Sequence, residues 1–110
     1  SPDDAVLDCS TPDMFTTVAT QAGFSRVRSR ARLTRFGGDC YAYCLLAMGL
    51  IDVVVESSLQ AYDVQALMPI VEGAGGVMTT WRGERCDDGG DVVACGDPAL
   101  HDAVRALLCR

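Results

Sequence analysis

The stretch Ile51–Gly76, IDVVVESSLQAYDVQALMPIVEGAGG, has the clearest secondary-structure pattern in the chain. Its first six residues, Ile51–Glu56, are rich in β-branched side chains and predict a strand. A loop over residues 57–62 follows, and Asp63 then opens an apolar helix that ends in the glycine-rich segment Gly73–Gly76. A buried strand followed closely by a capped helix is typical of layered α/β domains.

The same alternation continues on both sides of this stretch. Strands are predicted at Ala5–Ser10, Ala31–Phe36, Gly76–Trp81 and Asp91–Gly96. Further helices are predicted from Pro12 to about Ala22, from Cys40 to about Met48, and from Pro98 to about Leu108, with Gly23 and Gly49 ending the first two. Residues 1–110 therefore predict a single α/β domain in which helices cover a sheet.

Four aspartates stand at the expected helix starts: Asp13, Asp39, Asp63 and Asp97. Aspartate is among the best capping residues, so helix capping explains all four. Helix amino ends also bind phosphate, and a carboxylate placed there can hold Mg²⁺ against that phosphate. The pattern of residues leaves both interpretations open.

Composition and charge exclude several classes of protein. The net charge of −6 argues against a non-specific nucleic-acid binder, which needs a basic surface. No apolar run is long enough to span a membrane, and the N-terminal residues do not resemble a signal peptide. We therefore expect a cytoplasmic protein that binds neither nucleic acid nor membrane.

The chain contains six cysteines. A secreted disulfide scaffold is one interpretation, but the cysteines lie in apolar periodic segments, where free thiols fill cores. Cys40 and Cys44 are spaced for one helix face, and the only histidine, His101, is remote, so we expect core packing there and no metal site. The arginines between positions 26 and 35 form a basic run that suits either phosphate attraction or a solvated face, and we expect the solvated face: Arg26, Arg28, Arg30, Arg32 and Arg35.

The segment Gly37–Gly83, GGDCYAYCLLAMGLIDVVVESSLQAYDVQALMPIVEGAGGVMTTWRG, resembles the C-terminal half of the inositol monophosphatase superfamily. The second signature of that family, an aromatic residue, Asp and an apolar helix ending in EGAGG, matches Tyr62, Asp63 and Glu72–Gly76. The blocks GGDCYAY, CSTPDMF and GDPALHDAV are most similar to the histidinol-phosphate phosphatase branch.

This resemblance implies a Mg²⁺-dependent phosphomonoesterase acting on a small substrate of the histidinol-phosphate or inositol-phosphate type. It implies that Asp63 is the C-terminal metal ligand of the family. It further implies that Glu56 contacts the alcohol part of the substrate, and that Gly38 and Asp39 line the substrate pocket. A carboxylate at Asp39 suits a cationic amine or imidazole on the substrate.

The first signature of the family is not found in the chain. That signature is a Glu in an acidic loop followed by the motif Asp-Pro-Ile/Leu-Asp-Gly-Ser/Thr, and it supplies the first metal site and the hydroxyl that helps to activate water. We therefore assign no catalytic residue and expect residues 1–110 to be the C-terminal half of the fold, without the N-terminal metal-binding half. Alone, the chain is expected to be inactive.

Such a half-domain is expected to expose an apolar surface or a sheet edge. We expect an N-terminal half-chain, or further copies in a homo-oligomer, to cover it. The alternative is a non-catalytic domain that kept the fold and acts as a binding or oligomerisation module.

Overall fold

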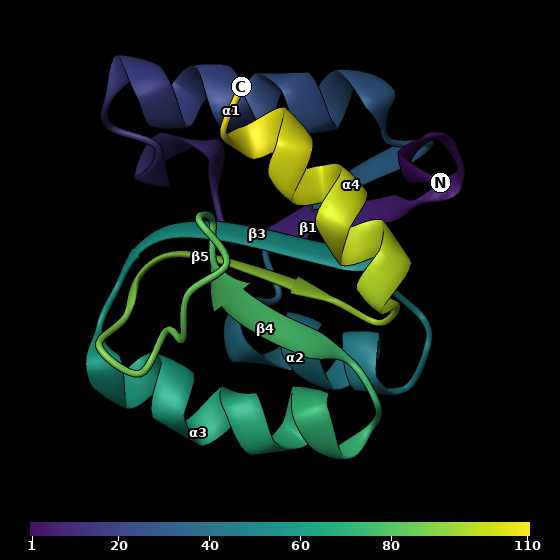
Figure 1. Ribbon diagram of the computed structural model, residues 1–110, viewed down its shortest axis with the longest axis vertical. Helices are drawn as coiled ribbons and strands as arrows, with labels where there is room; N and C mark the ends of the chain where they lie inside the picture. Colours follow the sequence, from purple (N-terminus) through teal and green to yellow (C-terminus); the bar gives the residue numbers. More distant parts are fainter.

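The computed structural model describes residues 1–110 and contains one mixed sheet of five strands in the order β2-β1-β3-β5-β4 (Figure 1). The strands are β1 Val6–Cys9, β2 Leu33–Phe36, β3 Val53–Leu59, β4 Val77–Thr80 and β5 Gly90–Cys95. Strand β1 runs parallel to β2 and β3, whereas β5 is antiparallel to both β3 and β4. The predicted α/β class is confirmed.

Helices cover both faces of the sheet (Figure 1). The helices are α1 Val18–Arg30, α2 Asp39–Ala47, α3 Ala61–Gly73 and α4 Pro98–Leu108, and short 3₁₀ turns occupy Pro2–Asp4 and Pro12–Met14. Helices α1 and α4 pack on one face, and α2 and α3 pack on the other. None of the helices combines the length and the apolar character needed to cross a membrane.

Two buried clusters, one on each face, form the core. Successive side chains of a strand point to opposite faces, so Val53 and Val55 join the cluster beneath α1 and α4, whereas Val54 joins the cluster beneath α2 and α3. In the first cluster, the rings of Phe15 and Phe24 stack with their centroids 4.3 Å apart. Strand β3 therefore contributes side chains to the cores on both faces of the sheet.

The predicted start of the first helix is wrong. Residues Pro12–Met14 form only a 3₁₀ turn, and α1 begins at Val18. Thr17 and Thr20 form a reciprocal capping box at that point, with Thr17 Oγ1 accepting from the Thr20 amide at 3.1 Å. This box satisfies two free amides, whereas the Thr11 side chain before Pro12 satisfies only one, that of Asp13 at 3.3 Å.

The predicted end of that helix at Gly23 is also wrong, because α1 continues to Arg30. Gly23 is buried where α1 meets the end of α4, and a Cβ atom at this position would lie 2.8 Å from the Leu108 carbonyl oxygen. The glycine therefore permits a close approach of two helices and does not end one.

Smaller differences occur around the central stretch. Strand β3 continues to Leu59, into the expected loop, and α3 begins at Ala61 with Gln60 as its N-cap. Asp63 is thus the third residue of the helix and not its cap. Asp39 is likewise the first residue of α2, and Gly38 is its N-cap.

All six cysteines are free, and Cys9, Cys86 and Cys95 are buried, as core packing requires. Cys44 is half-buried, but Cys40 is exposed, so the prediction that Cys40 fills the core is wrong. Cys40 lies in the first turn of α2 and is not among its buried residues, which are Ala42, Tyr43 and Leu46.

Strand β2 forms one edge of the sheet and pairs only with β1. Its side chains Leu33 and Phe36 are 49% and 43% exposed, and Met48 and Leu50 after α2 are exposed as well. An unpaired edge with apolar side chains invites association with another segment. The expected bare edge is present, and the partner that covers it stays a prediction.

Candidate active site

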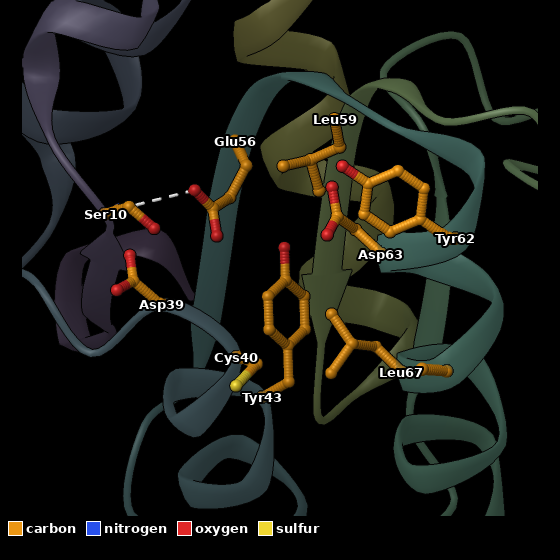
Figure 2. A pocket seen from close by; sticks show the side chains of 10 residues that line it. Ser10, Asp39, Cys40, Tyr43, Glu56, Leu59, Tyr62, Asp63 and Leu67 are labelled. Carbon is orange, nitrogen blue, oxygen red and sulfur yellow. Dashed lines mark hydrogen bonds between the residues drawn. The ribbon is translucent and has the colours of Figure 1, made fainter.

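A cavity of about 370 Å³ opens where β1 and β3 lead into their loops and where α2 and α3 begin (Figure 2). Its lining comes from these elements: Ser10, Asp39, Cys40, Tyr43, Glu56, Leu59, Tyr62, Asp63, Ala66 and Leu67. Carboxyl ends of parallel strands and amino ends of helices meet at one edge of an α/β sheet, which is the usual place for a ligand.

Asp39 reaches the cavity from an unusual turn. Gly37, Gly38 and Asp39 have φ angles of 87°, 91° and 44°, so three successive residues adopt the left-handed conformation. Glycine does so freely, and aspartate is one of the few other residues that tolerates it. The turn brings the Asp39 carboxylate to the rim of the cavity, where it is exposed.

Glu56 is the buried acid of the cavity, with only 2% of its surface exposed. Its Oε2 accepts a hydrogen bond from the Ser10 amide at 3.4 Å. Burial raises the pKa of Glu56, while Ser10 and the Tyr43 hydroxyl act in the opposite direction. The side chain therefore presents a weakly solvated acceptor to the interior of the cavity.

A bulge directly follows Glu56 in β3. The pairing register with β5 shifts between Glu56 and Leu59, and Ser58 takes a φ of 60°. Asp91 holds the bulge in place, because its Oδ1 accepts from Ser57 Oγ at 2.6 Å and from the Ser58 amide at 3.3 Å. The bulge ends the regular strand where the chain turns into α3.

Asp63 lies in the first turn of α3 and is half-buried in the cavity wall. Its Oδ2 accepts a hydrogen bond from the Gln60 amide at 3.0 Å, so the side chain does stabilise the helix start. An ionised carboxylate has about four acceptor positions, and this bond uses one of them. Capping therefore leaves Asp63 able to bind something in the cavity.

Tyr43, within the helix predicted from Cys40 to about Met48, was not predicted as a site residue. Tyr43 is 1% exposed, yet its hydroxyl has no hydrogen-bond partner in the protein. The hydroxyl points into the cavity between Glu56 and Asp63 (Figure 2). A signal was present in the sequence, because Tyr43 follows Asp39 by four residues and thus shares its helix face.

Asp8 was not predicted as a site residue either, although it is the only charged residue in the predicted strand Ala5–Ser10. It is 2% exposed, and its Oδ1 has no hydrogen-bond partner in the protein. Burial raises the pKa of Asp8 to about 6, with Asp39 adding to the effect and Arg35 opposing it. A Cβ atom on Gly38 would lie 3.8 Å from Asp8 Oδ2, so Gly38 packs beside Asp8.

Three of the four residues predicted for the site thus line one cavity: Asp39, Glu56 and Asp63. Gly38 does not line it and instead forms the turn behind it. No three His, Cys, Asp or Glu side chains lie close enough together to hold a metal ion. Mg²⁺ requires several oxygen ligands in an octahedron, so the donors of this chain alone do not fit a Mg²⁺ cluster.

A model of the inositol monophosphatase family matches residues 6–110, and the chain belongs to that family. It is 42% identical over 106 residues to a protein named bifunctional phosphatase IMPL2, chloroplastic, from Arabidopsis thaliana. That match covers 88% of this chain and 30% of the relative. A histidinol-phosphatase from Mycobacterium tuberculosis is 39% identical over 71 residues, covering 64% of this chain and 27% of the relative.

Among solved structures, an inositol monophosphatase from Zymomonas mobilis superposes with a TM-score of 0.90 and 39% sequence identity. The superposition covers 96% of this chain and 42% of that chain. The resemblance to this family and to its histidinol-phosphatase branch is therefore confirmed, and the named relatives are phosphatases. The chain spans less than half the length of these relatives.

Proposed function

We propose that residues 1–110 form the substrate-pocket part of a Mg²⁺-dependent phosphomonoesterase acting on histidinol phosphate or an inositol phosphate. The observation that carries this proposal is the convergence of Asp39, Glu56 and Asp63 on one cavity at the carboxyl edge of the sheet. Family membership supports phosphatase chemistry over the alternative of a non-catalytic binding module.

The charge of the cavity supports a requirement for metal. Its lining contains three carboxylates and no Lys, Arg or His. A phosphate ester is repelled by such a lining unless a divalent cation lies between them. Mg²⁺ supplies that positive charge and lowers the pKa of bound water. In this proposal Asp63 contributes one ligand, and the other ligands lie outside residues 1–110.

The same lining suits the alcohol part of the substrate. Glu56 and Asp39 are acceptors, so they bind hydroxyl, ammonium or imidazole N–H groups. A cationic amino alcohol such as histidinol gains more from these carboxylates than a neutral sugar alcohol does. We therefore propose that Glu56 and Asp39 orient the alcohol while Gly38 shapes the turn that carries Asp39.

We also propose that the N-terminal half of the family fold, on the same polypeptide or on a second one, packs against the exposed β2 edge. The relatives contain a large region outside this superposition, and β2 offers unpaired backbone groups beside Leu33 and Phe36. Light scattering on the 110-residue chain with and without such a half tests this. A 1:1 complex is expected, whereas a stable homo-oligomer that does not bind the added half would contradict the proposal.

The phosphatase proposal is tested by measuring phosphate release from histidinol phosphate and inositol 1-phosphate. The 110-residue chain is assayed alone and after combination with a half that carries the acidic loop and the Asp-Pro-Ile/Leu-Asp-Gly-Ser/Thr motif. We expect release only from the combination, only with MgCl₂, and not after EDTA is added. Failure of the folded combination to hydrolyse either ester would overturn the proposal.

A further inference from the structure

We propose that the Tyr43 hydroxyl is a specificity-determining group that hydrogen-bonds a donor on the alcohol part of the substrate. This inference rests on the proposed phosphatase function, because it places the alcohol in the cavity lined by Tyr43. It goes further in naming a binding group for the alcohol in addition to Glu56 and Asp39.

The Tyr43 hydroxyl is buried without a hydrogen-bond partner in the protein. Tyr43 is the largest of the fully buried side chains, at 1% exposure, and its hydroxyl has no hydrogen-bond partner in the protein. Buried hydroxyls are nearly always paired, because an unpaired one loses its bonds to water and gains nothing. Phenylalanine has the same ring without that cost. A hydroxyl kept in this position is therefore expected to bind something that enters the cavity.

The Tyr43 hydroxyl also points into the cavity (Figure 2). Helix α2 places Tyr43 one turn after Asp39, and the phenol rises from the cavity floor between Glu56 on β3 and Asp63 on α3 (Figure 2). A phenol hydroxyl has one donor and two lone pairs with which to bind a ligand.

The groups that surround the Tyr43 hydroxyl determine which guest, meaning the ligand bound in the cavity, it suits. The side chains that face Tyr43, Glu56 and Asp63, are both acceptors. Even if the phenol proton were donated to one of these carboxylates, the lone pairs of the hydroxyl would remain for a donor on the guest. A hydroxyl, ammonium or imidazole N–H group on the alcohol meets that need, and an aromatic ester without donors does not.

Packing is the competing explanation for Tyr43, since its ring belongs to the buried cluster beneath α2 and α3. Tyr43→Phe separates the two roles, because it removes the hydroxyl and retains the ring. Tyr41→Phe is the matched control: Tyr41 is on the same helix, 62% exposed, and does not line the cavity. A structural role for the ring predicts that Tyr43→Phe behaves like Tyr41→Phe in every kinetic assay.

The test measures kcat and KM in the Mg²⁺-loaded enzyme that contains residues 1–110. The substrates are histidinol phosphate, inositol 1-phosphate and p-nitrophenyl phosphate, the last having no donor on its alcohol part. For Tyr43→Phe we expect KM for histidinol phosphate or inositol 1-phosphate to rise by about fivefold to tenfold. Kinetics on p-nitrophenyl phosphate should be unchanged, and the thermal midpoint equal or higher. Unchanged KM values, or an equal change on all three substrates, would overturn the inference.

A second measurement separates this inference from the proposed function. Calorimetric titration with histidinol and with myo-inositol reports binding of the alcohol without hydrolysis. An inactive enzyme that binds either alcohol more tightly than its Tyr43→Phe variant would support the role of Tyr43 and overturn the phosphatase proposal. An active enzyme whose affinity for the alcohols and whose KM are unchanged by Tyr43→Phe would support the phosphatase proposal and overturn the role of Tyr43. An enzyme that is inactive and binds neither alcohol would overturn both.

Discussion

The face of the sheet covered by α1 and α4 and the face covered by α2 and α3 differ in how their buried polar groups are satisfied. Beneath α1 and α4, Thr20 is bonded within its capping box, and His101 Nε2 lies 2.8 Å from the Thr79 hydroxyl. Beneath α2 and α3 lie the two buried side-chain atoms without a partner, Asp8 Oδ1 and Tyr43 Oη.

Charge follows the same division. Glu56 and Asp8 are buried acids with raised pKa values on the α2 and α3 side, and burial is the main cause for both. On the other side, the Phe15 and Phe24 rings close the core without ionised groups. The face beneath α1 and α4 thus has its buried polar groups satisfied, whereas the face beneath α2 and α3 holds unpartnered ones at a cost in stability, which is typical of ligand-binding sites.

The largest expected effect is the loss of activity in Asp63→Asn. The asparagine side-chain oxygen can accept the bond from the Gln60 amide that Asp63 Oδ2 accepts, so the thermal midpoint should change little. Replacing the carboxylate proposed to bind Mg²⁺ by an amide should lower kcat/KM of the combined enzyme by about 1000-fold. Steady-state kinetics across a MgCl₂ series measures this.

The control for that prediction is Asp97→Asn at the start of α4. Asp97 Oδ1 accepts from the Ala99 amide at 3.1 Å, which confirms the predicted cap, and Asp97 is outside the cavity. Both activity and stability should be retained in this variant. If Asp63→Asn also keeps its rate and its Mg²⁺ dependence, Asp63 is a capping residue only.

A matched pair of leucines sharpens the comparison through stability. Leu107 on α4 and Leu67 on α3 are 5% and 7% exposed, and Leu67 also lines the cavity. Leu107→Ala should reduce the free energy of unfolding by about 3–4 kcal/mol, because it opens a void in a closed core. Leu67→Ala should cost about 2 kcal/mol, since part of its surroundings is already open. Urea denaturation measures both, and equal losses would remove the proposed division between the faces.

The smallest effect is expected from Asp8→Asn, and it depends on pH. The pKa of Asp8 rises from 3.8 to about 6 on folding, so the folded state binds the proton more tightly than the unfolded state. The contribution of Asp8 to stability is therefore full below about pH 4 and is lost as pH rises through 6.

Asparagine avoids that loss, so Asp8→Asn should be more stable than the parent chain by about 1 kcal/mol at pH 7 and equal to it near pH 4. Arg35 offsets part of the burial cost, which keeps the expected gain small. Urea denaturation at the two pH values checks this. A variant that is less stable at pH 7 would show that the ionised carboxylate is stabilising.

The sequence was informative where local rules and topology agree. Strand and helix alternation follows from β-branched runs and caps, whereas Asp39, Glu56 and Asp63, which line one cavity, were predicted as site residues from the family resemblance. It was uninformative where a distant segment determines the outcome. Gly23 resembles a helix stop until the Leu108 backbone is placed against it, and Tyr43 resembles core until its hydroxyl is found without a partner.

The left-handed turn at residues 37–39 restricts how this pocket can change during evolution. Asp39 combines a charge at the rim with a backbone angle of 44° that most side chains avoid. Asparagine and glycine are the replacements that keep the turn relaxed, so a mutation that introduces a bulky or β-branched residue alters ligand preference and strains the backbone together. Changes in substrate preference at position 39 are therefore expected to use only a few residue types. Other residue types would require a different conformation of the loop at residues 37–39.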